Sequence, residues 1–228
     1  MIPEVEALLG NLLNEPPAVR TAAKRSLYDF FEFHLAAGDF SLGHGVGEFD
    51  TERRPIDTIV IHHTSNVPGL SGVRLSAIEL MRFYGPYFAN PPKGDRKLRG
   101  RPIFSGHEHD GRQVFWPYHW LIRGDGRTER LLSDSETGWH AGNWEINCRS
   151  IAIVLDGDYE HNRPSKTVLK SMADLIHRQY PEVLNERILG HCEITGKTTC
   201  PSRLFLWGRI RQGWKEELVS LVGLQRAA

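Results

Sequence analysis

Residues 56–63 read IDTIVIHH and residues 150–155 read SIAIVL, and these two stretches decide the fold. Both are short apolar runs rich in β-branched residues, which are typical of strands buried on both faces of a sheet. Extended and helical patterns alternate along the chain around them, an order typical of a sheet covered by helices. The sequence therefore predicts an α/β fold with a mixed central β-sheet flanked by helices.

Further elements are indicated by turn and capping signals. The turn Gly124-Asp125-Gly126 separates residues 118–123 from residues 127–133, which predicts a β-hairpin. Ser165 precedes apolar residues at helical spacing, so it is suited to cap a helix there. We also expect helices over residues 76–84 and 204–222, and a short strand over residues 187–189.

The N-terminal region differs from the rest in its pattern. Residues 3–14 and 17–36 are predicted to be helices separated by Pro16 and Pro17, and a glycine-rich polar stretch follows at residues 38–47. We therefore expect a helical N-terminal extension at residues 1–48 and a main domain at residues 49–228. The extension is too small for a core of its own, so we expect it to dock on the main domain or on a partner.

Composition restricts the class of protein. The 228 residues include 28 basic and 28 acidic side chains, so net charge gives no reason to expect nucleic acid as a partner. The chain shows neither a secretory signal nor the roughly 20 consecutive apolar residues of a transmembrane helix. We expect a cytoplasmic protein, with release by lysis or by a dedicated secretion system as the alternative. Three cysteines, Cys148, Cys192 and Cys200, favour a reducing compartment or a metal role over a disulfide framework.

Two histidines, His62 and His63, end the first apolar strand. Binding groups in open α/β sheets gather where strands end, and side chains alternate along a strand, so only one of the two can face a given site. A hydrogen-bonded pair of histidines without a metal is an equally open interpretation of these two residues alone.

A second cluster lies in residues 190–201, which read GHCEITGKTTCP. Cys200 stands in a polar loop beside Pro201, nine residues after His191, which is an unusual place for a core cysteine. Catalytic zinc sites use three nitrogen, sulfur or oxygen ligands and leave the fourth position to water. One strand-end histidine together with His191 and Cys200 would supply such a set.

Five segments give the chain a specific resemblance over about residues 55–210. Together they resemble the type 2 N-acetylmuramoyl-L-alanine amidases, a superfamily that includes phage lysozyme amidases and peptidoglycan recognition proteins. The segments are IVIHHTS (59–65), YHWLIRGDGRTERLL (118–132), GWHAGNW (138–144), NCRSIAIVLDGDY (147–159) and GHCEITGKTTCPSRLF (190–205). The resemblance implies a fold like that of the peptidoglycan recognition proteins.

The resemblance also implies a set of site residues. His62, His191 and Cys200 match the three zinc ligands, and Tyr118 matches the tyrosine that hydrogen-bonds the reacting amide or its water. A lysine or threonine near the last ligand stabilises the oxyanion in relatives, and Lys197 or Thr198 occupies that region here. We favour Lys197 for its charge.

Substrate contacts are implied for the segment GWHAGNW. His140 resembles a residue of the substrate groove, and Trp139 and Asn143 are predicted to bind substrate with it. One position departs from some relatives, which carry a glutamate where this chain has Val154. Proton transfer is then left to Tyr118, to Lys197 or to the zinc site itself.

One other cluster, His107-Glu108-His109-Asp110, has metal-binding residue types. Its histidines are two residues apart, closer than the spacing of four in the helical motif of zinc proteases. A solvated loop is the favoured interpretation of this stretch.

The expected function is zinc-dependent hydrolysis of the amide bond between N-acetylmuramic acid and L-alanine in peptidoglycan or muropeptides. The first alternative is a module that binds peptidoglycan without cleaving it, and the second is a regulatory protein that acts through its N-terminal helices. An endolysin, a recycling enzyme and an exported antibacterial toxin all fit the expected activity.

Overall fold

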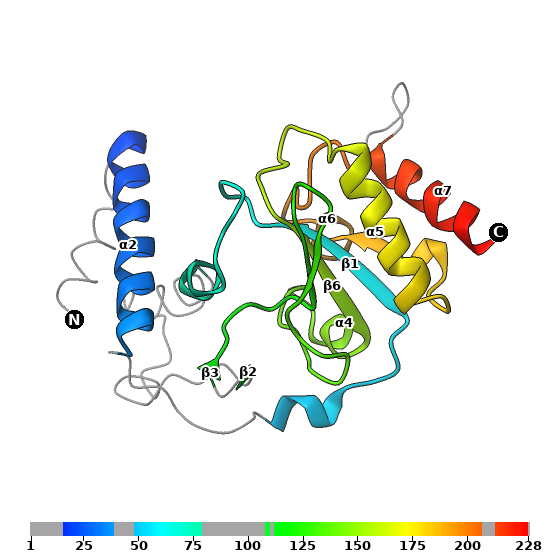
Figure 1. The fold of residues 1–228 in the computed structure, drawn as a ribbon, viewed down its shortest axis with the longest axis horizontal. Coiled ribbons are helices and arrows are strands. Elements are labelled where there is room, and N and C mark those ends of the chain that lie inside the picture. Colours follow the sequence, from blue (N-terminus) through cyan, green and yellow to red (C-terminus); the bar gives the residue numbers. More distant parts are fainter. Residues whose placement is uncertain (1–15, 39–47, 79–107, 110–111, 207–212, 228) are drawn as a thin grey trace. The chain divides into compact units, whose positions relative to one another are not determined.

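The computed structural model describes residues 16–38, 48–78, 108–109, 112–206 and 213–227 (Figure 1). The chain divides into two compact units, Met1–Gly47 with Ser71–Trp116 and Glu48–Leu70 with Pro117–Ala228. All of the predicted site residues belong to the second unit. The division into residues 1–48 and 49–228 stays a prediction.

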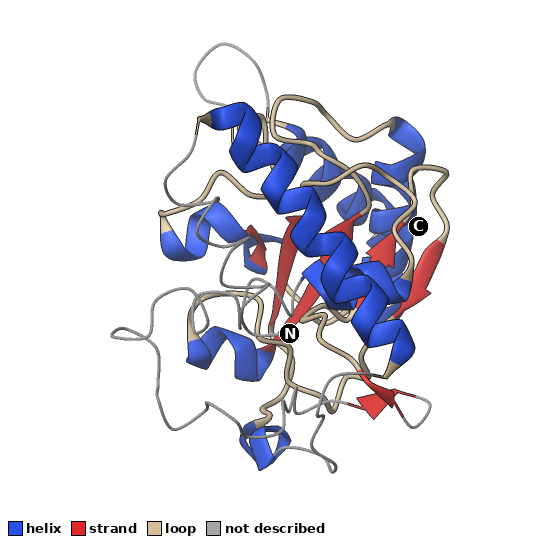
Figure 2. Cartoon of the chain, turned by 90° about the vertical axis from the view of Figure 1, so that its left-hand side faces the viewer, coloured by secondary structure: helices blue, strands red, loops and turns tan. Residues whose placement is uncertain are grey.

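The second unit is built on a five-stranded sheet. Its order is β5-β4-β6-β1-β7, and its strands are β1 (Thr58–His63), β4 (Trp120–Ile122), β5 (Thr128–Arg130), β6 (Ser150–Leu155) and β7 (Ile188–Gly190). Strand β1 pairs in parallel with β6 and β7, β4 pairs in parallel with β6, and β5 is antiparallel to β4. Figure 2 shows the strands of this sheet side by side, in red. The predicted mixed sheet and the hairpin around Gly124–Gly126 are confirmed.

One face of the sheet carries the main hydrophobic core. Helices α5 (Lys166–Gln179) and α7 (Trp214–Arg226) contact each other and pack on this face. The Ser165 hydroxyl accepts a hydrogen bond from the Val168 amide at 3.2 Å, so the predicted cap is confirmed. The fully buried sheet residues of this core are Ile59, Ile61, Ile122, Ile151, Ile153, Leu155 and Ile188.

The last helix begins later than the sequence pattern predicts. The prediction of a helix from residue 204 was wrong, because α7 begins at Trp214. The carbonyls of Leu204 and Phe205 accept hydrogen bonds from the amides of Trp214 and Lys215, so the earlier residues lie beside the first turn of the helix. The side chains of Phe205 and Trp214 are buried against each other, with ring centroids 4.5 Å apart. Apolar residues at 204 and 205 therefore reflect core packing outside the helix.

Short helices that the sequence did not predict complete the second unit. They are η1 (Glu48–Glu52), α4 (Trp144–Arg149), η3 (Asn185–Arg187) and α6 (His191–Thr195). Each is too short for a full apolar stripe, which is the signal that predicts a helix. Two of them, α4 and α6, stand at the site described below.

The first unit contains the long helix α2 (Pro17–Ala37) and the strand pair β2 (Glu108–His109) and β3 (Arg112–Gln113). Helix α2 confirms the prediction for residues 17–36, and it buries Leu27 and Phe31. Residues 72–78 are also helical, while the predicted helix at 3–14 and the rest of the helix at 76–84 lie outside the described residues. Among the residues that are described, no helix is both long enough and apolar enough to cross a membrane.

Candidate metal centre

Strand β1 separates its two terminal histidines onto opposite sides of the sheet. His62 stands opposite Val154 of β6, on the face away from α5 and α7. His63 points to the other side, where its Nδ1 accepts a hydrogen bond from the Tyr159 amide at 3.0 Å. The two histidines thus face opposite sides of the sheet, as alternation predicts, and His62 is the one that lies in the cluster with His191 and Cys200.

His191 and Cys200 come from a compact turn after β7. Strand β7 ends at Gly190, and His191 opens the short helix α6 on the side of the sheet that His62 occupies. The Cys192 amide donates a hydrogen bond of 2.8 Å to the Cys200 carbonyl, which ties the two segments together. Glu193 accepts from the Gly190 amide and from Lys215, so it stabilises the start of α6.

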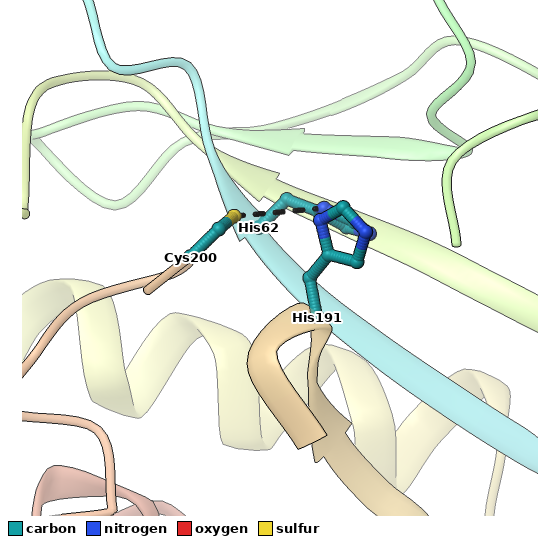
Figure 3. A group of neighbouring side chains, drawn as sticks. All are labelled: His62, His191 and Cys200. Atoms are coloured by element: carbon teal, nitrogen blue, oxygen red, sulfur yellow. Dashed lines mark hydrogen bonds between the residues drawn. The ribbon is translucent and has the colours of Figure 1, made fainter. Parts of the chain in front are cut away.

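The three predicted ligands converge, as Figure 3 shows. One ligand atom from each of His62, His191 and Cys200 lies within 4.8 Å of the others, and Cys200 Sγ is 3.7 Å from His62 Nδ1. Tetrahedral zinc with ordinary bond lengths holds nitrogen and sulfur ligands about 3.3–3.6 Å apart. The donor set and its spacing therefore fit zinc after small side-chain adjustments.

Behind His62 lies a buried chain of polar side chains. His62 Nε2 is 3.0 Å from His140 Nδ1, and His140 Nε2 is 3.0 Å from Ser150 Oγ. All three side chains are buried. Burial holds the pKa of His140 well below its ordinary value, and the neighbouring His119 and His191 lower it further. His140 is therefore neutral, so one ring nitrogen donates a hydrogen bond and the other accepts one.

His191 lies beside the turn that follows His140, near Gly142. Burial lowers the pKa of His191, while a hydrogen bond between its ring and the Ala141 backbone acts in the opposite sense. Neutral imidazole is the form that binds metal ions, so the lowered pKa keeps His191 ready for a metal near neutral pH.

The predicted catalytic residues lie around this cluster at different depths. Tyr118 is buried, and its ring centroid lies 5.3 Å from that of His62. The Thr198 hydroxyl accepts a hydrogen bond of 3.1 Å from the Cys200 amide, whereas the Lys197 side chain is exposed. Their catalytic roles stay predictions.

The predicted substrate contacts fall into two groups. Trp139 is exposed, and its ring packs edge-on against Trp144 at 5.9 Å. Asn143 is exposed as well, and its Oδ1 caps helix α4 by accepting from the Ile146 amide. His140, in contrast, is buried with 6% of its surface exposed. Substrate binding by all three stays a prediction.

Two buried polar residues of this site were missed by the sequence analysis. Ser150 ends the hydrogen-bonded chain from His62, and Asn147 Oδ1 accepts from the amides of His140 and Ala141 at 3.2 and 2.8 Å. The only signal for Ser150 is a polar residue that opens an apolar strand. Asn147 lies next to Cys148 and carries no local signal of its role.

The family of the chain is shown by comparison with known proteins. Residues 52–203 match the family model described as N-acetylmuramoyl-L-alanine amidase. That region contains the three converging residues and the whole five-stranded sheet. The fold is that of the peptidoglycan amidases and recognition proteins, and the chain belongs to the N-acetylmuramoyl-L-alanine amidase family.

Individual relatives agree with this assignment. The chain is 29% identical to 1,6-anhydro-N-acetylmuramyl-L-alanine amidase AmpD of Haemophilus influenzae over 172 residues, which cover 71% of this chain and 85% of AmpD. It is 28% identical to peptidoglycan-recognition protein SD of Drosophila melanogaster over 44% of this chain and 55% of that protein. Among solved structures, the amidase LysC from Clostridium intestinale has the same fold, with a TM-score of 0.51 and 17% identity over 81% of this chain and 96% of LysC.

Proposed function

We propose that the protein is a zinc-dependent hydrolase that cleaves the amide bond between N-acetylmuramic acid and L-alanine. The convergence of His62, His191 and Cys200 carries this proposal, because it gathers a zinc-type donor set from segments far apart in the sequence. Membership of the amidase family and the similarity to AmpD supply the substrate class. The substrate is peptidoglycan or a soluble muropeptide.

The three converging residues would hold the zinc through two imidazole nitrogens and one thiolate. Zinc bound by three protein ligands activates water and polarises a carbonyl oxygen. Metal ions bind the thiolate form of cysteine, so Cys200 would lose its proton on metal binding. This ligand set leaves one position for water or for the amide oxygen.

The remaining roles follow from the residues around the cluster. Tyr118 would hydrogen-bond the reacting amide, and the position of its buried ring beside that of His62 supports this role. The Thr198 hydroxyl lies at the Cys200 amide and Lys197 is exposed in the same turn, so both are candidates to stabilise the oxyanion. Val154 is the residue opposite His62, so the sheet supplies no carboxylate there for proton transfer.

The test combines metal content with product analysis. We expect the wild-type protein to bind one zinc per chain and to release stem peptides that begin with L-alanine from purified peptidoglycan. Cys200→Ala should lose both properties, while Cys148→Ala, which changes a buried cysteine outside the cluster, should keep them. Mass spectrometry identifies the cleaved bond.

A peptidoglycan-binding module without catalysis is the competing function. The exposed rings of Trp139 and Trp144 favour this binding function, because the faces of aromatic rings can pack against sugar rings. Stoichiometric zinc without cleavage of polymer or muropeptide would support that function over hydrolysis.

A further inference from the structure

The two ring nitrogens of His62 have different neighbours, and these neighbours indicate which nitrogen carries the proton. Its Nδ1 faces Cys200 Sγ at 3.7 Å, and its Nε2 lies 3.0 Å from His140 Nδ1. A nitrogen that binds a metal carries no proton, so metal binding at Nδ1 places the proton of His62 on Nε2. His62 then donates to His140.

The same logic fixes the proton of His140. Because its Nδ1 accepts from His62, its own proton stands on Nε2 and is donated to Ser150 Oγ at 3.0 Å. The chain from His62 through His140 to Ser150 therefore has one direction. Since the whole chain is buried, removal of His140 would take away the buried acceptor that faces His62 Nε2, and the loss of a buried hydrogen bond is costly.

The second metal-site histidine meets the next residue of the same turn. The ring of His191 lies beside Gly142 of that turn. Its Nε2 is the nitrogen on this side, because a Cβ added to Gly142 would lie 4.0 Å from that atom. The turn that carries His140 therefore also lies next to the second histidine of the cluster.

The turn that carries His140 is held in place by hydrogen bonds to Asn147 and by the glycines on either side of it. Asn147 Oδ1 accepts from the amides of His140 and Ala141, and the Asn147 side chain is buried in α4. On either side the turn depends on glycine. Gly142 has a φ of 64°, and a Cβ at Gly138 would lie 2.1 Å from the Pro117 carbonyl oxygen.

We propose that His140, held in its turn by Asn147 and by Ser150, forms a clamp that positions His62 of the metal centre with Nδ1 toward the metal. His140 is thus a positioning residue that acts through His62. The clamp rests on the proposed function only in requiring that the cluster binds zinc. Partners of this kind typically change metal affinity by about 10–100-fold.

The test uses two substitutions of nearly equal shape. In His140→Asn the side-chain oxygen stands where Nδ1 stood and can accept from His62, whereas His140→Leu has no acceptor. Both lose the ring, so loss of packing lowers the zinc affinity of both to a similar extent. In chelator competition we expect His140→Asn to bind zinc within about threefold of the wild type, and His140→Leu to bind about 10–100-fold more weakly.

Equal zinc affinities in the two variants would overturn the clamp. A wild-type protein that binds no zinc would overturn the proposed function together with the clamp, so the two failures are distinguishable. If His140→Leu does not fold, the tautomers decide the question in the zinc-loaded wild type by ¹⁵N NMR of the imidazole rings. We expect a proton on Nε2 of His62, and ligation of the metal through His62 Nε2 would refute the clamp.

Discussion

The two faces of the five-stranded sheet use the same strands for opposite purposes. One face presents Ile59, Ile61, Ile151 and Ile153 to α5 and α7, and its residues are buried in an apolar core. The other face carries His62 and Ser150, which contact His140 beside the candidate metal cluster. Because successive side chains of a strand point to opposite faces, the same strand contributes to the apolar core on one side and to the candidate site on the other. Substitutions on the two faces should have separable effects.

Loss of a metal ligand should have the largest effect. We expect His191→Ala to abolish zinc binding and to slow amide cleavage by about a thousandfold or more, because the zinc contribution to the transition state is several kcal/mol. Zinc analysis and product release measure both effects. His161→Ala, which removes an exposed histidine outside the cluster, is the control and should retain full activity. Substantial cleavage by His191→Ala would break the assignment of chemistry to the polar face.

A core substitution on the opposite face should act on stability instead. We expect Ile153→Ala to lower the free energy of unfolding by about 2–5 kcal/mol, and Ile153→Val by about 0.5–1.5 kcal/mol, because both leave a cavity in a fully buried position. Urea denaturation measures these values. Activity per folded molecule should stay near that of the wild type. A change in zinc affinity with little loss of stability would show that the two faces are not separable.

Tyr180, which follows α5, should make the apolar side sensitive to alkaline pH. Burial raises the pKa of Tyr180 to about 12, although its hydrogen bond from Trp120 acts in the opposite direction. The folded state then retains the proton between pH 10 and 12 while the unfolded state loses it. Tyr180 contributes stability that is fully present below about pH 10 and is lost as the pH rises through about 12, by at most about 3 kcal/mol.

The difference in unfolding free energy between wild type and Tyr180→Phe isolates this contribution. We expect the difference to be constant from pH 7 to pH 9 and to shrink steadily above pH 10. A difference in unfolding free energy that does not change up to pH 12 would contradict the raised pKa of Tyr180.

A smaller effect is expected at the start of α5. Ser165→Ala removes the acceptor for the Val168 amide and should cost about 1 kcal/mol in unfolding free energy. Ser165→Asp keeps an acceptor and should lose little. Equal losses in the two variants would indicate that the hydroxyl does not cap the helix.

The elements that were predicted correctly are those with strong local patterns. The β-branched runs at β1 and β6 and the capped apolar stripe of α5 are each recognisable within about ten residues. The start of α7 was not recognisable, because Leu204 and Phe205 are apolar for packing beside the helix rather than within it. Helices α4 and α6 have too few residues to show a period.

The three candidate metal ligands could be predicted from the sequence, whereas the residues that contact them could not. His62, His191 and Cys200 were predicted from residue type, position at strand ends and family resemblance, and the structure brings them together. The hydrogen bonds made by Asn147 and Ser150 were not predictable. They form only because the fold brings α4 and the start of β6 next to the turn at His140. His140 was expected in a substrate groove, and its side chain is buried because the fold packs it between His62 and Ser150.

Zinc-dependent cleavage is tested most directly by following one soluble muropeptide through metal removal and return. The substrate is N-acetylmuramyl-L-alanyl peptide, and mass spectrometry records its products with the zinc-loaded, chelator-stripped and zinc-restored protein. We predict free peptide with an N-terminal L-alanine from the loaded protein, none from the stripped protein, and recovery when one zinc per chain is returned. Cleavage that persists without zinc, or no cleavage by protein that carries one zinc per chain, would contradict the assignment of zinc-dependent hydrolysis to the polar face of this sheet.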